Sequence, residues 1–192
     1  MLSVKDRQQL LAMARRTVKE HLGAEEAAPG LAETIVEDLL EERGAFVTLT
    51  RDGRLRGCIG TFRPNGSLWD TVQQMALSAA ISDPRFPSVT APEVELLEFE
   101  ISALTPLTRI DDIAEIVVGT HGLYITKGFH GGVLLPQVAV EYGWDKTQFL
   151  EHTCQKAGLS PDAWKQPDVT IEIFSAEVFS ESDLEGTRVS CA

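Results

Sequence analysis

The sequence predicts an α+β fold in which helices pack against antiparallel sheets. Two pairs of strand-like segments, 45–50 with 55–62 and 123–126 with 133–135, flank turn-forming stretches typical of β-hairpins. Segments with helical periodicity do not alternate with strands in the regular rhythm that a parallel sheet requires. A length of 192 residues allows one large domain or two small ones, and either can bury a sizeable apolar core.

Two helices are predicted before the first hairpin. Ser3 and Asp6 have the spacing of a capping box, and apolar residues recur at helical intervals over 3–22. A second helix places apolar residues on one face over 31–40 and ends at Arg43-Gly44, which combines a cationic last turn with a C-terminal glycine.

Asp52-Gly53 is a strong signal for the two-residue turn of the first hairpin. A regular ladder built on this turn places Cys58 opposite Val47 and Arg56 opposite Leu49. In that register, Arg56 and Cys58 share one face of the sheet.

The middle of the chain predicts a helix, a short capped turn and a strand. Ser67 opens the helix, which ends before Asp83-Pro84 because a residue that precedes proline disfavours helical angles. Residues 90–93 have the pattern of another capping box, and 98–103 alternate as a half-buried strand does. Thr105-Pro106 then breaks the strand and marks a crossing point.

Beyond Pro106 the patterns predict a short helix, a second hairpin, two helices and a closing strand. In chain order these are residues 111–118, 123–135 with Gly128–Gly132 between the strands, 136–142, 145–157 and 169–174. Residues 180–192 are polar, and we expect them to fray.

Composition narrows the class of protein. Seventeen Lys and Arg against 29 Asp and Glu give a net charge of −12, which repels nucleic-acid phosphates. The apolar runs are too short for a membrane helix and the N-terminus lacks a secretory signal, so we expect a cytoplasmic protein. The spacing of Cys58, Cys154 and Cys191 fits reduced thiols better than disulfides or a zinc site. Neither a metal nor a cofactor is predicted.

Four arginines at positions 51, 54, 56 and 63 form a local exception in this acidic chain. Such a patch can hold a carboxylate, a phosphate or an acidic peptide segment. The alternative is that Arg51 and Arg54 solvate the hairpin tip and pair with nearby acids. For Arg56, which precedes Gly57-Cys58, both interpretations stay open.

The run Arg56-Gly57-Cys58-Ile59-Gly60 is the most suggestive short motif. Glycines inside a strand weaken it and often mark a bulge or the close approach of a backbone or ligand. An adjacent positive charge would stabilise a Cys58 thiolate, as a nucleophile or redox-sensitive thiol requires. The alternative is a buried cysteine that acts as a small hydrophobe.

Further candidates lie outside the hairpin. Asp83 and Arg85 surround a rigid turn, where they form either a structural ion pair or the wall of a binding cleft. Gln137 and Glu141 are four residues apart on a predicted helix, where they either serve a ligand or face solvent. Cys154 is in register with apolar residues of its helix, so we expect it in the core.

Leu55 to Gly60 matches in full the hallmark hexapeptide Leu-Arg-Gly-Cys-Ile-Gly of the AMMECR-one family, whose prokaryotic branch is called AmmeMemoRadiSam system protein A. The resemblance continues in the family's order over most of residues 45–180. Further matching stretches are 46–49, 83–86, 100–102, 122–123, 134–138, Glu141, Trp144, 149–150, Cys154, 157–159 and Trp164.

The resemblance implies two unequal lobes, each an antiparallel sheet with helices, and a hexapeptide that faces a cleft between them. Applied to this sequence, residues 1–106 and 167–192 form the larger lobe and 107–166 the smaller. These limits agree with the crossing points that Thr105-Pro106 and Gln166-Pro167 indicate. The resemblance also implies a genomic association with a Memo-like protein and a radical S-adenosylmethionine enzyme.

We therefore expect a binding or adaptor component that acts with these two proteins on a peptide, protein or small anionic substrate. In this hypothesis Arg56 contacts an anion, and Gly57 and Gly60 allow close approach. The alternative is an enzyme in which Cys58 is a nucleophile or redox thiol, assisted by Glu100, Glu141 or a histidine. The expected cleft residues are Leu55, Arg56, Gly57, Cys58, Ile59, Gly60, Arg85, Glu100 and Gln137, with Cys58 and Glu141 as candidate catalytic residues.

Overall fold

The computed structural model describes residues 1–23 and 37–185, and it has the α+β class that the sequence predicts. The chain divides into two compact units. The larger unit consists of Met1–Leu104 and Glu177–Ala192, and the smaller unit of Thr105–Ala176.

The larger unit contains α1 (Val4–His21), α2 (Glu37–Leu40) and α3 (Leu68–Ile81). Both predicted N-caps of the long helices are confirmed. Ser3 and Asp6 exchange hydrogen bonds in a capping box at α1, and Ser67 and Asp70 do the same at α3. The part of the second predicted helix before Glu37 lies outside the described residues.

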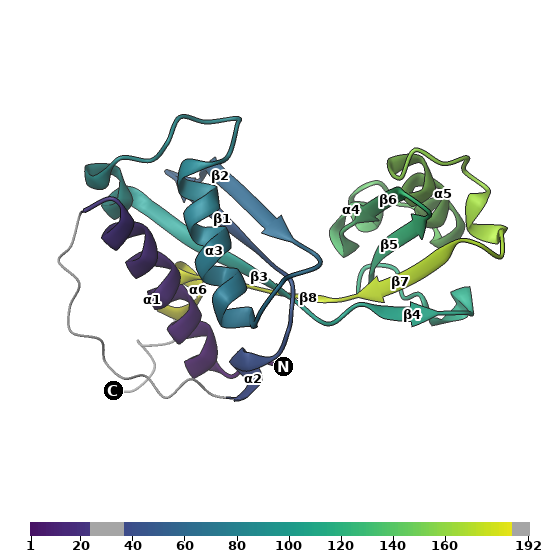
Figure 1. The fold of residues 1–192 in the computed structure, drawn as a ribbon, viewed down its shortest axis with the longest axis horizontal. Coiled ribbons are helices and arrows are strands. Elements are labelled where there is room, and N and C mark those ends of the chain that lie inside the picture. Colours follow the sequence, from purple (N-terminus) through teal and green to yellow (C-terminus); the bar gives the residue numbers. More distant parts are fainter. Residues whose placement is uncertain (24–36, 186–192) are drawn as a thin grey trace. The chain divides into compact units, whose positions relative to one another are not determined.

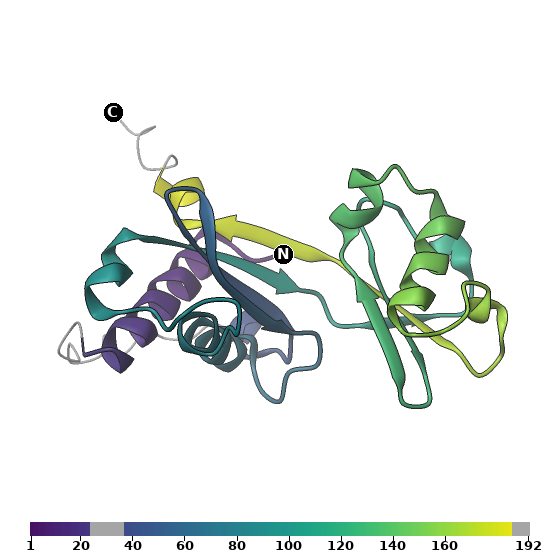
Figure 2. The same ribbon diagram turned by 90° about the horizontal axis from the view of Figure 1, so that it is seen from above.

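Four strands form the sheet of the larger unit in the order β2-β1-β3-β8. Their bounds are Ala45–Arg51 for β1, Arg54–Thr61 for β2, Leu97–Leu104 for β3 and Ala176–Ser180 for β8. Helices α1 and α3 cover one face of this sheet (Figures 1 and 2). Side chains from that face, such as Val47, Leu49 and Phe99, are fully buried in the core.

The register of the first hairpin differs from the prediction. Cys58 lies opposite Thr48, not Val47, and Gly57 lies opposite Leu49. A β-bulge near the turn is the physical reason, because the register shifts between Leu49 and Thr50 and leaves Arg56 as the extra residue of β2. Asp52 and Gly53 form the turn as predicted, both with positive φ.

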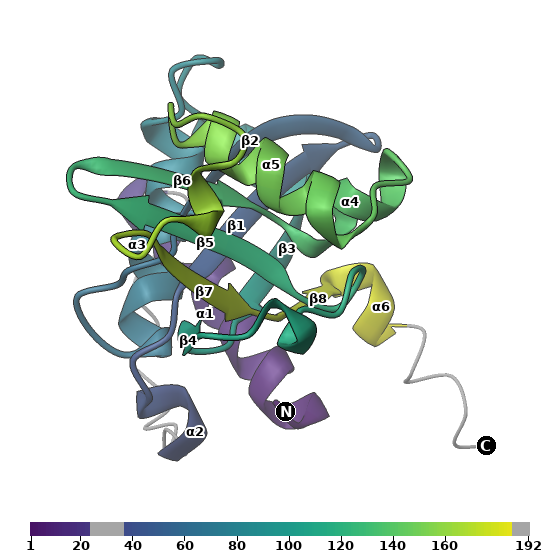
Figure 3. The same ribbon diagram turned by 90° about the vertical axis from the view of Figure 1, so that its right-hand side faces the viewer.

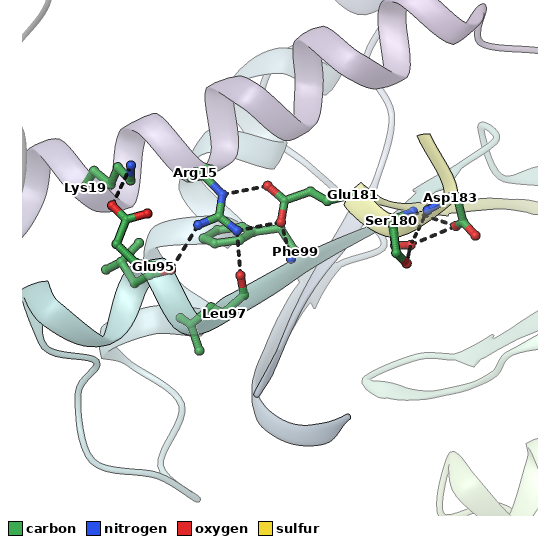
Figure 4. A network of polar contacts seen from close by, with 10 residues as sticks. Arg15, Lys19, Glu95, Leu97, Phe99, Ser180, Glu181 and Asp183 are labelled. Carbon is green, nitrogen blue, oxygen red and sulfur yellow. Dashed lines mark hydrogen bonds and ion pairs between the residues drawn. The ribbon is translucent and has the colours of Figure 1, made fainter. Parts of the chain in front are cut away.

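Residues 180–185 are ordered although the sequence predicts fraying over 180–192, and the rest of that stretch, 186–192, lies outside the described residues. After β8, α6 (Glu181–Glu185) packs against α1 and β3. Glu181 accepts hydrogen bonds from the Arg15 Nε and Nη2 atoms, each at 2.6 Å, and from the Phe99 backbone N–H at 3.0 Å (Figure 4). This two-point contact fixes a segment whose polar sequence gives no sign of order.

The smaller unit has a second four-stranded sheet, in the order β4-β7-β5-β6. Its strands are β4 (Thr108–Ile110), β5 (Gly122–Lys127), β6 (His130–Leu134) and β7 (Thr170–Phe174). Two helices, α4 (Pro136–Glu141) and α5 (Lys146–Lys156), lie over one face of this sheet (Figure 3). Cys154 is fully buried in the core beneath them, as predicted.

Short 3₁₀ turns complete the two units. They are η1 (Ala91–Leu96) in the larger unit and η2 (Ile113–Glu115) and η3 (Ala163–Lys165) in the smaller. The predicted helix over 111–118 is wrong, because η2 makes only one turn there. The glycine-rich connection of the second hairpin is shorter than predicted. Gly128-Phe129 is the turn, and His130 begins β6.

The division of the chain differs from the predicted lobes at one end. The chain leaves the larger unit after Leu104, beside the predicted crossing at Thr105-Pro106. It returns only after Ala176, well beyond the predicted Gln166-Pro167. The reason is that β7 pairs with β4 and β5, so residues 170–174 belong to the smaller sheet. Alternating hydrophobicity identifies a strand but not its partner.

Across the described residues, no helix is both long and apolar enough to cross a membrane.

Candidate functional site

The hexapeptide lies on β2, an edge strand of the larger sheet. Its side chains have different surroundings. Leu55 is 44% exposed near the turn, whereas Gly57 is buried and Ile59 packs partly against the core. The motif therefore combines residues that build the fold with residues that are accessible.

The two glycines of the motif allow close packing within the unit. A Cβ atom on Gly57 would lie 2.2 Å from the Ala79 backbone oxygen of α3, and one on Gly60 would lie 2.2 Å from the Phe46 ring. Real Cβ atoms do not approach other atoms so closely. The predicted close approach at Gly57 and Gly60 is thus made by the protein's own helix and aromatic ring.

Cys58 is half-buried on the sheet face opposite α1 and α3. Thr48 lies beside it on β1, and Glu100 lies beside Thr48 on β3, so the three side chains form a row across the strands. The Thr48 hydroxyl donates a hydrogen bond to the Cys58 Sγ atom at 3.4 Å. Burial, together with the charges of Asp183 and Glu98, raises the pKa of Glu100. We call Cys58, Thr48 and Glu100 the thiol row.

Asp83 and Arg85 close the free edge of β2 at Cys58. The buried Asp83 carboxylate accepts a hydrogen bond from the Cys58 backbone N–H at 2.9 Å, and Arg85 Nη2 donates to the Cys58 carbonyl at 3.1 Å. These are the backbone groups that an edge strand leaves unpaired. The two side chains also bind each other, with Nε to Oδ1 at 2.9 Å and Nη2 to Oδ2 at 2.7 Å.

The pKa values of the Asp83–Arg85 pair follow from this geometry. Hydrogen bonds from the Arg85 side chain, with further help from the Cys58 backbone N–H, hold the pKa of Asp83 far below its usual range. Hydrogen bonding to Asp83 raises the pKa of Arg85, and the Cys58 thiol raises it further. The Arg85 side chain remains 53% exposed, so a fixed guanidinium lies at the surface beside the thiol.

Arg56, which we expected to contact an anion, already has a carboxylate partner. Its Nε and Nη2 atoms donate to Glu93 of η1 at 2.7 and 3.1 Å, and both side chains are largely buried. This pairing lowers the pKa of Glu93. The buried Nη1 atom of Arg56 has no hydrogen-bond partner among the residues that the structure describes. The guanidinium that contacts Cys58 is therefore that of Arg85, because the bulge directs Arg56 to Glu93.

Arg51 and Arg54 follow the structural alternative at the hairpin tip. Arg51 forms ion pairs with Asp52 and Glu93, at 3.8 and 3.6 Å. Arg54 is exposed at the turn. Pairing of this kind neutralises much of the local positive charge that the sequence indicates.

Gln137 and Glu141 are both exposed on α4, in the smaller unit, and thus are not in the unit that holds the thiol row. Cys154 is fully buried on α5, and desolvation raises the pKa of its thiol. Of the predicted site residues, the structure gathers Cys58, Arg85 and Glu100 around one sheet edge and face.

The sequence does not predict two contacts of Cys58. One is the Thr48 hydroxyl at its sulfur, and the other is the Asp83 carboxylate at its backbone N–H. The contact with Thr48 is not predicted because a regular hairpin register places Thr48 opposite Gly57, whereas the bulge places it opposite Cys58. The sequence leaves open whether Asp83 and Arg85 form a structural ion pair or a cleft wall. The ion pair is present, and the bond from the Cys58 backbone N–H to Asp83 joins positions 25 residues apart. Only the bulge and the fold bring these groups to the same place.

Comparisons with known proteins identify the same family that the hexapeptide indicates. The AMMECR1 family model matches residues 11–179. The chain is 40% identical to "Protein MK0488" of Methanopyrus kandleri, covering 96% of this chain and 93% of the relative. It is 42% identical to "Protein TK0174" of Thermococcus kodakarensis, over 92% and 91% of the two chains.

A solved structure is similar throughout as well. The crystal structure of uncharacterized protein PH0010 from Pyrococcus horikoshii has 41% sequence identity and a TM-score of 0.72. The match covers 90% of this chain and 89% of that one. Both the family model and these relatives extend over nearly all of the present sequence, so the chain belongs to the AMMECR1 family.

Proposed function

We propose that this protein is a binding component that acts with a Memo-like protein and a radical S-adenosylmethionine enzyme. It contacts a peptide, protein or small anionic substrate through Arg85 and Cys58. One observation supports this proposal most directly. Asp83 holds the exposed Arg85 guanidinium against the edge of β2, beside a half-buried thiol.

A guanidinium fixed in this way is suited to bind an anionic group. Its Nε and Nη2 atoms bind Asp83 and the Cys58 carbonyl, and the side chain is still 53% exposed, so a ligand has access to the guanidinium. Since the side chain is already ordered, a carboxylate or phosphate that binds it incurs little further loss of conformational entropy. Glu98 and Glu100 lie on β3, so the anionic group of the ligand would lie on the β2 side of the thiol row.

Co-purification from a strain that expresses all three proteins tests this assignment. Arg85→Gln keeps a hydrogen-bonding side chain but removes the charge, and we expect it to reduce recovery of the two partners about tenfold. Arg51→Gln, at the exposed end of the hairpin, is the matched control and should retain them. Equal recovery by wild type and Arg85→Gln would overturn the assignment of Arg85.

A second candidate function is an enzyme in which Cys58 is the nucleophile or a redox thiol. The observation that favours it is the pair of groups around Sγ. The Thr48 hydroxyl donates to the sulfur, and the Arg85 charge interacts with it. A hydrogen-bond donor and a cation beside the sulfur are the surroundings that a nucleophilic cysteine requires.

Alkylation by iodoacetamide separates the two candidates. In this reaction the thiolate sulfur bonds to the methylene carbon and iodide leaves. In a Cys191→Ser background, an activated Cys58 reacts fast below pH 8, and Thr48→Val and Arg85→Gln move the rate profile to higher pH. A profile like that of free cysteine, unchanged by both variants, excludes the activated thiol and leaves the binding function.

A further inference from the structure

We propose that the larger unit binds an extended peptide segment that carries an acidic and a basic side chain four residues apart. The acidic group contacts Arg85 and the basic group contacts Glu100, at the two ends of the thiol row. This inference rests on the function proposed above. It narrows the substrate class from an anionic ligand to a peptide that carries both charges.

One continuous sheet face joins the two ends. Cys58 pairs with Thr48, and Thr48 pairs with Glu100, in the registers of β2, β1 and β3. Directly paired residues of neighbouring strands point to the same face of a sheet. The hydrogen bond from the Thr48 hydroxyl to the Cys58 Sγ atom, at 3.4 Å, shows that these two side chains are in contact. All three side chains are half-buried, so the thiol row is accessible along its length.

The β2 end of the thiol row is cationic. The Arg85 Nη2 atom donates to the Cys58 carbonyl at 3.1 Å, in the position that a donor from a further strand would occupy. Asp83 binds the same guanidinium, but its side chain is only 2% exposed, whereas that of Arg85 is 53% exposed. A ligand that approaches this end therefore meets the guanidinium and not the carboxylate.

Glu100, at the β3 end, is an acid without a cationic partner. Burial and the charges of Asp183 and Glu98 raise its pKa, and none of the described residues supplies a hydrogen bond or a cation that acts in the other direction. Glu98 lies two positions along β3, on the same face of the sheet. A half-buried carboxylate in such surroundings is stabilised by an incoming lysine or arginine side chain.

The length of the thiol row favours a peptide over a smaller ligand. Neighbouring strands lie about 4.8 Å apart, and three such spacings separate Arg85, beyond β2, from β3, which makes about 14 Å. A free amino acid cannot bridge this distance, because its amino and carboxylate groups are attached to the same carbon. In an extended peptide, residues four apart are also separated by about 14 Å, and their side chains point the same way.

The charges at the two ends disfavour other occupants. Glu98 and Glu100 repel a purely anionic ligand, and Arg85 repels a purely cationic one. A second copy of this chain fits less well, because two molecules of net charge −12 repel each other. The side chains between the ends, those of Cys58 and Thr48, are small, so a peptide backbone can lie close to the sheet.

Fluorescence anisotropy with three pentapeptides, blocked at both ends and labelled with an uncharged dye, tests the proposal. Their sequences are Glu-Ser-Ser-Ser-Lys, Glu-Ser-Ser-Ser-Gln and Gln-Ser-Ser-Ser-Lys. At physiological salt we expect the first to bind about tenfold more tightly than either of the others, because both of its charges have partners. Equal affinities for the three, or no binding of the first at about 1 mM, would overturn the proposal.

Variants at the acidic end locate the basic group of the peptide. Glu100→Gln should remove the preference for lysine over glutamine at the last position, and Glu100→Lys should reverse it in favour of Glu-Ser-Ser-Ser-Glu. Glu115→Gln is the matched control, since it removes the same charge from an exposed position in the smaller unit. A lysine preference that persists in Glu100→Gln would refute the contact.

Arg85→Gln separates this inference from the proposed function. It should weaken binding of the Glu-Ser-Ser-Ser-Lys peptide about tenfold. If it does so while Glu100→Gln changes nothing, Arg85 binds an anionic group as proposed, and only the peptide with two charges is wrong. If Arg85→Gln leaves the affinity unchanged, the proposed contact of Arg85 and this inference both fail.

Discussion

The two units have similar architectures, but the cysteine of the larger unit is half-buried and that of the smaller unit is fully buried. Each has a four-stranded sheet with helices on one face, and each has a glycine where a helical segment comes closest to a strand. In the smaller unit Cys154 lies on the inner side of α5 and is fully buried in the core. In the larger unit Cys58 is on the opposite face, half-buried and next to Arg85.

The difference shows that the accessibility of a cysteine depends on whether its side chain points into the core or away from it. Desolvation keeps Cys154 protonated and inaccessible, because burial penalises the thiolate. Cys58 is instead half-buried, with the Thr48 hydroxyl donating to its sulfur and the Arg85 guanidinium beside it. The larger unit therefore carries an accessible cysteine on a strand, whereas Cys154 in the smaller unit is a helix residue that fills the core.

The largest expected effect tests the parallel between the units. In Gly57→Ala the new Cβ would meet the Ala79 oxygen at 2.2 Å, and in Gly132→Ala it would meet the Ala157 nitrogen at 2.3 Å. Because both obstacles are backbone atoms, each variant should lose about 3 kcal/mol of unfolding free energy, at the upper end of overpacking costs. Urea denaturation measures this loss.

Gly131→Ala is the control for these two variants. Its Cβ would lie 3.3 Å from the Tyr124 hydroxyl, at the end of a side chain that can shift. Its cost should be well below that of Gly132→Ala. If Gly57→Ala were as mild as this control, the close contact of α3 with β2 would not exist.

The second prediction sharpens the contrast between the cysteines. In native protein lacking Cys191, Cys58 should be alkylated about a hundredfold faster than Cys154, which reacts only when its unit opens. Peptide mass spectrometry after timed labelling measures both rates in one sample. Comparable rates would mean that Cys58 is as protected as Cys154 and would remove the basis of the proposed site.

The third prediction concerns the pH dependence of the edge contact. The pKa of Asp83 is depressed in the folded state, so its ionised form stabilises the protein above the usual carboxyl pKa of about 4. That stabilisation is lost as the pH falls below this value toward the folded-state pKa. Asp83→Asn should lower the unfolding midpoint at pH 7 and flatten its decline between pH 5 and pH 3.

Asp70→Asn is a suitable control, because that carboxylate caps α3 on the exposed surface. Its profile should resemble that of the wild type. A wild-type acid profile in Asp83→Asn would show that the contact between Asp83, Arg85 and Cys58 contributes nothing.

The smallest expected effect is that of Glu100→Gln, which should stabilise the protein at pH 7, whereas Asp83→Asn should destabilise it. The pKa of Glu100 is raised in the folded state, so its stability contribution declines as the pH rises through its usual value toward the folded value. Glu100→Gln should therefore slightly raise the melting temperature at pH 7 and leave it unchanged at pH 4. Thermal melts at the two pH values measure this difference, and a lower melting temperature at pH 7 would contradict the raised pKa.

Much of the local structure follows from the sequence because its causes are local. The capping boxes at Ser3 and Ser67, the Asp52-Gly53 turn and the buried stripe that includes Cys154 all depend on residues within a few positions of each other. The AMMECR1 family was also identified at this level, since six consecutive residues carry its signature. These features are confirmed.

Contacts between distant segments were decided only by the tertiary structure. A bulge shifts the register at Cys58, and Arg56 forms an ion pair with Glu93. Strand β7 pairs with β5 in the smaller sheet. Each of these outcomes depends on which of several distant segments a strand or side chain pairs with. The periodicity of the sequence does not identify that partner. The sequence by itself determined the elements and the motif that matters, whereas the fold decided that Arg85, and not Arg56, lies at the thiol.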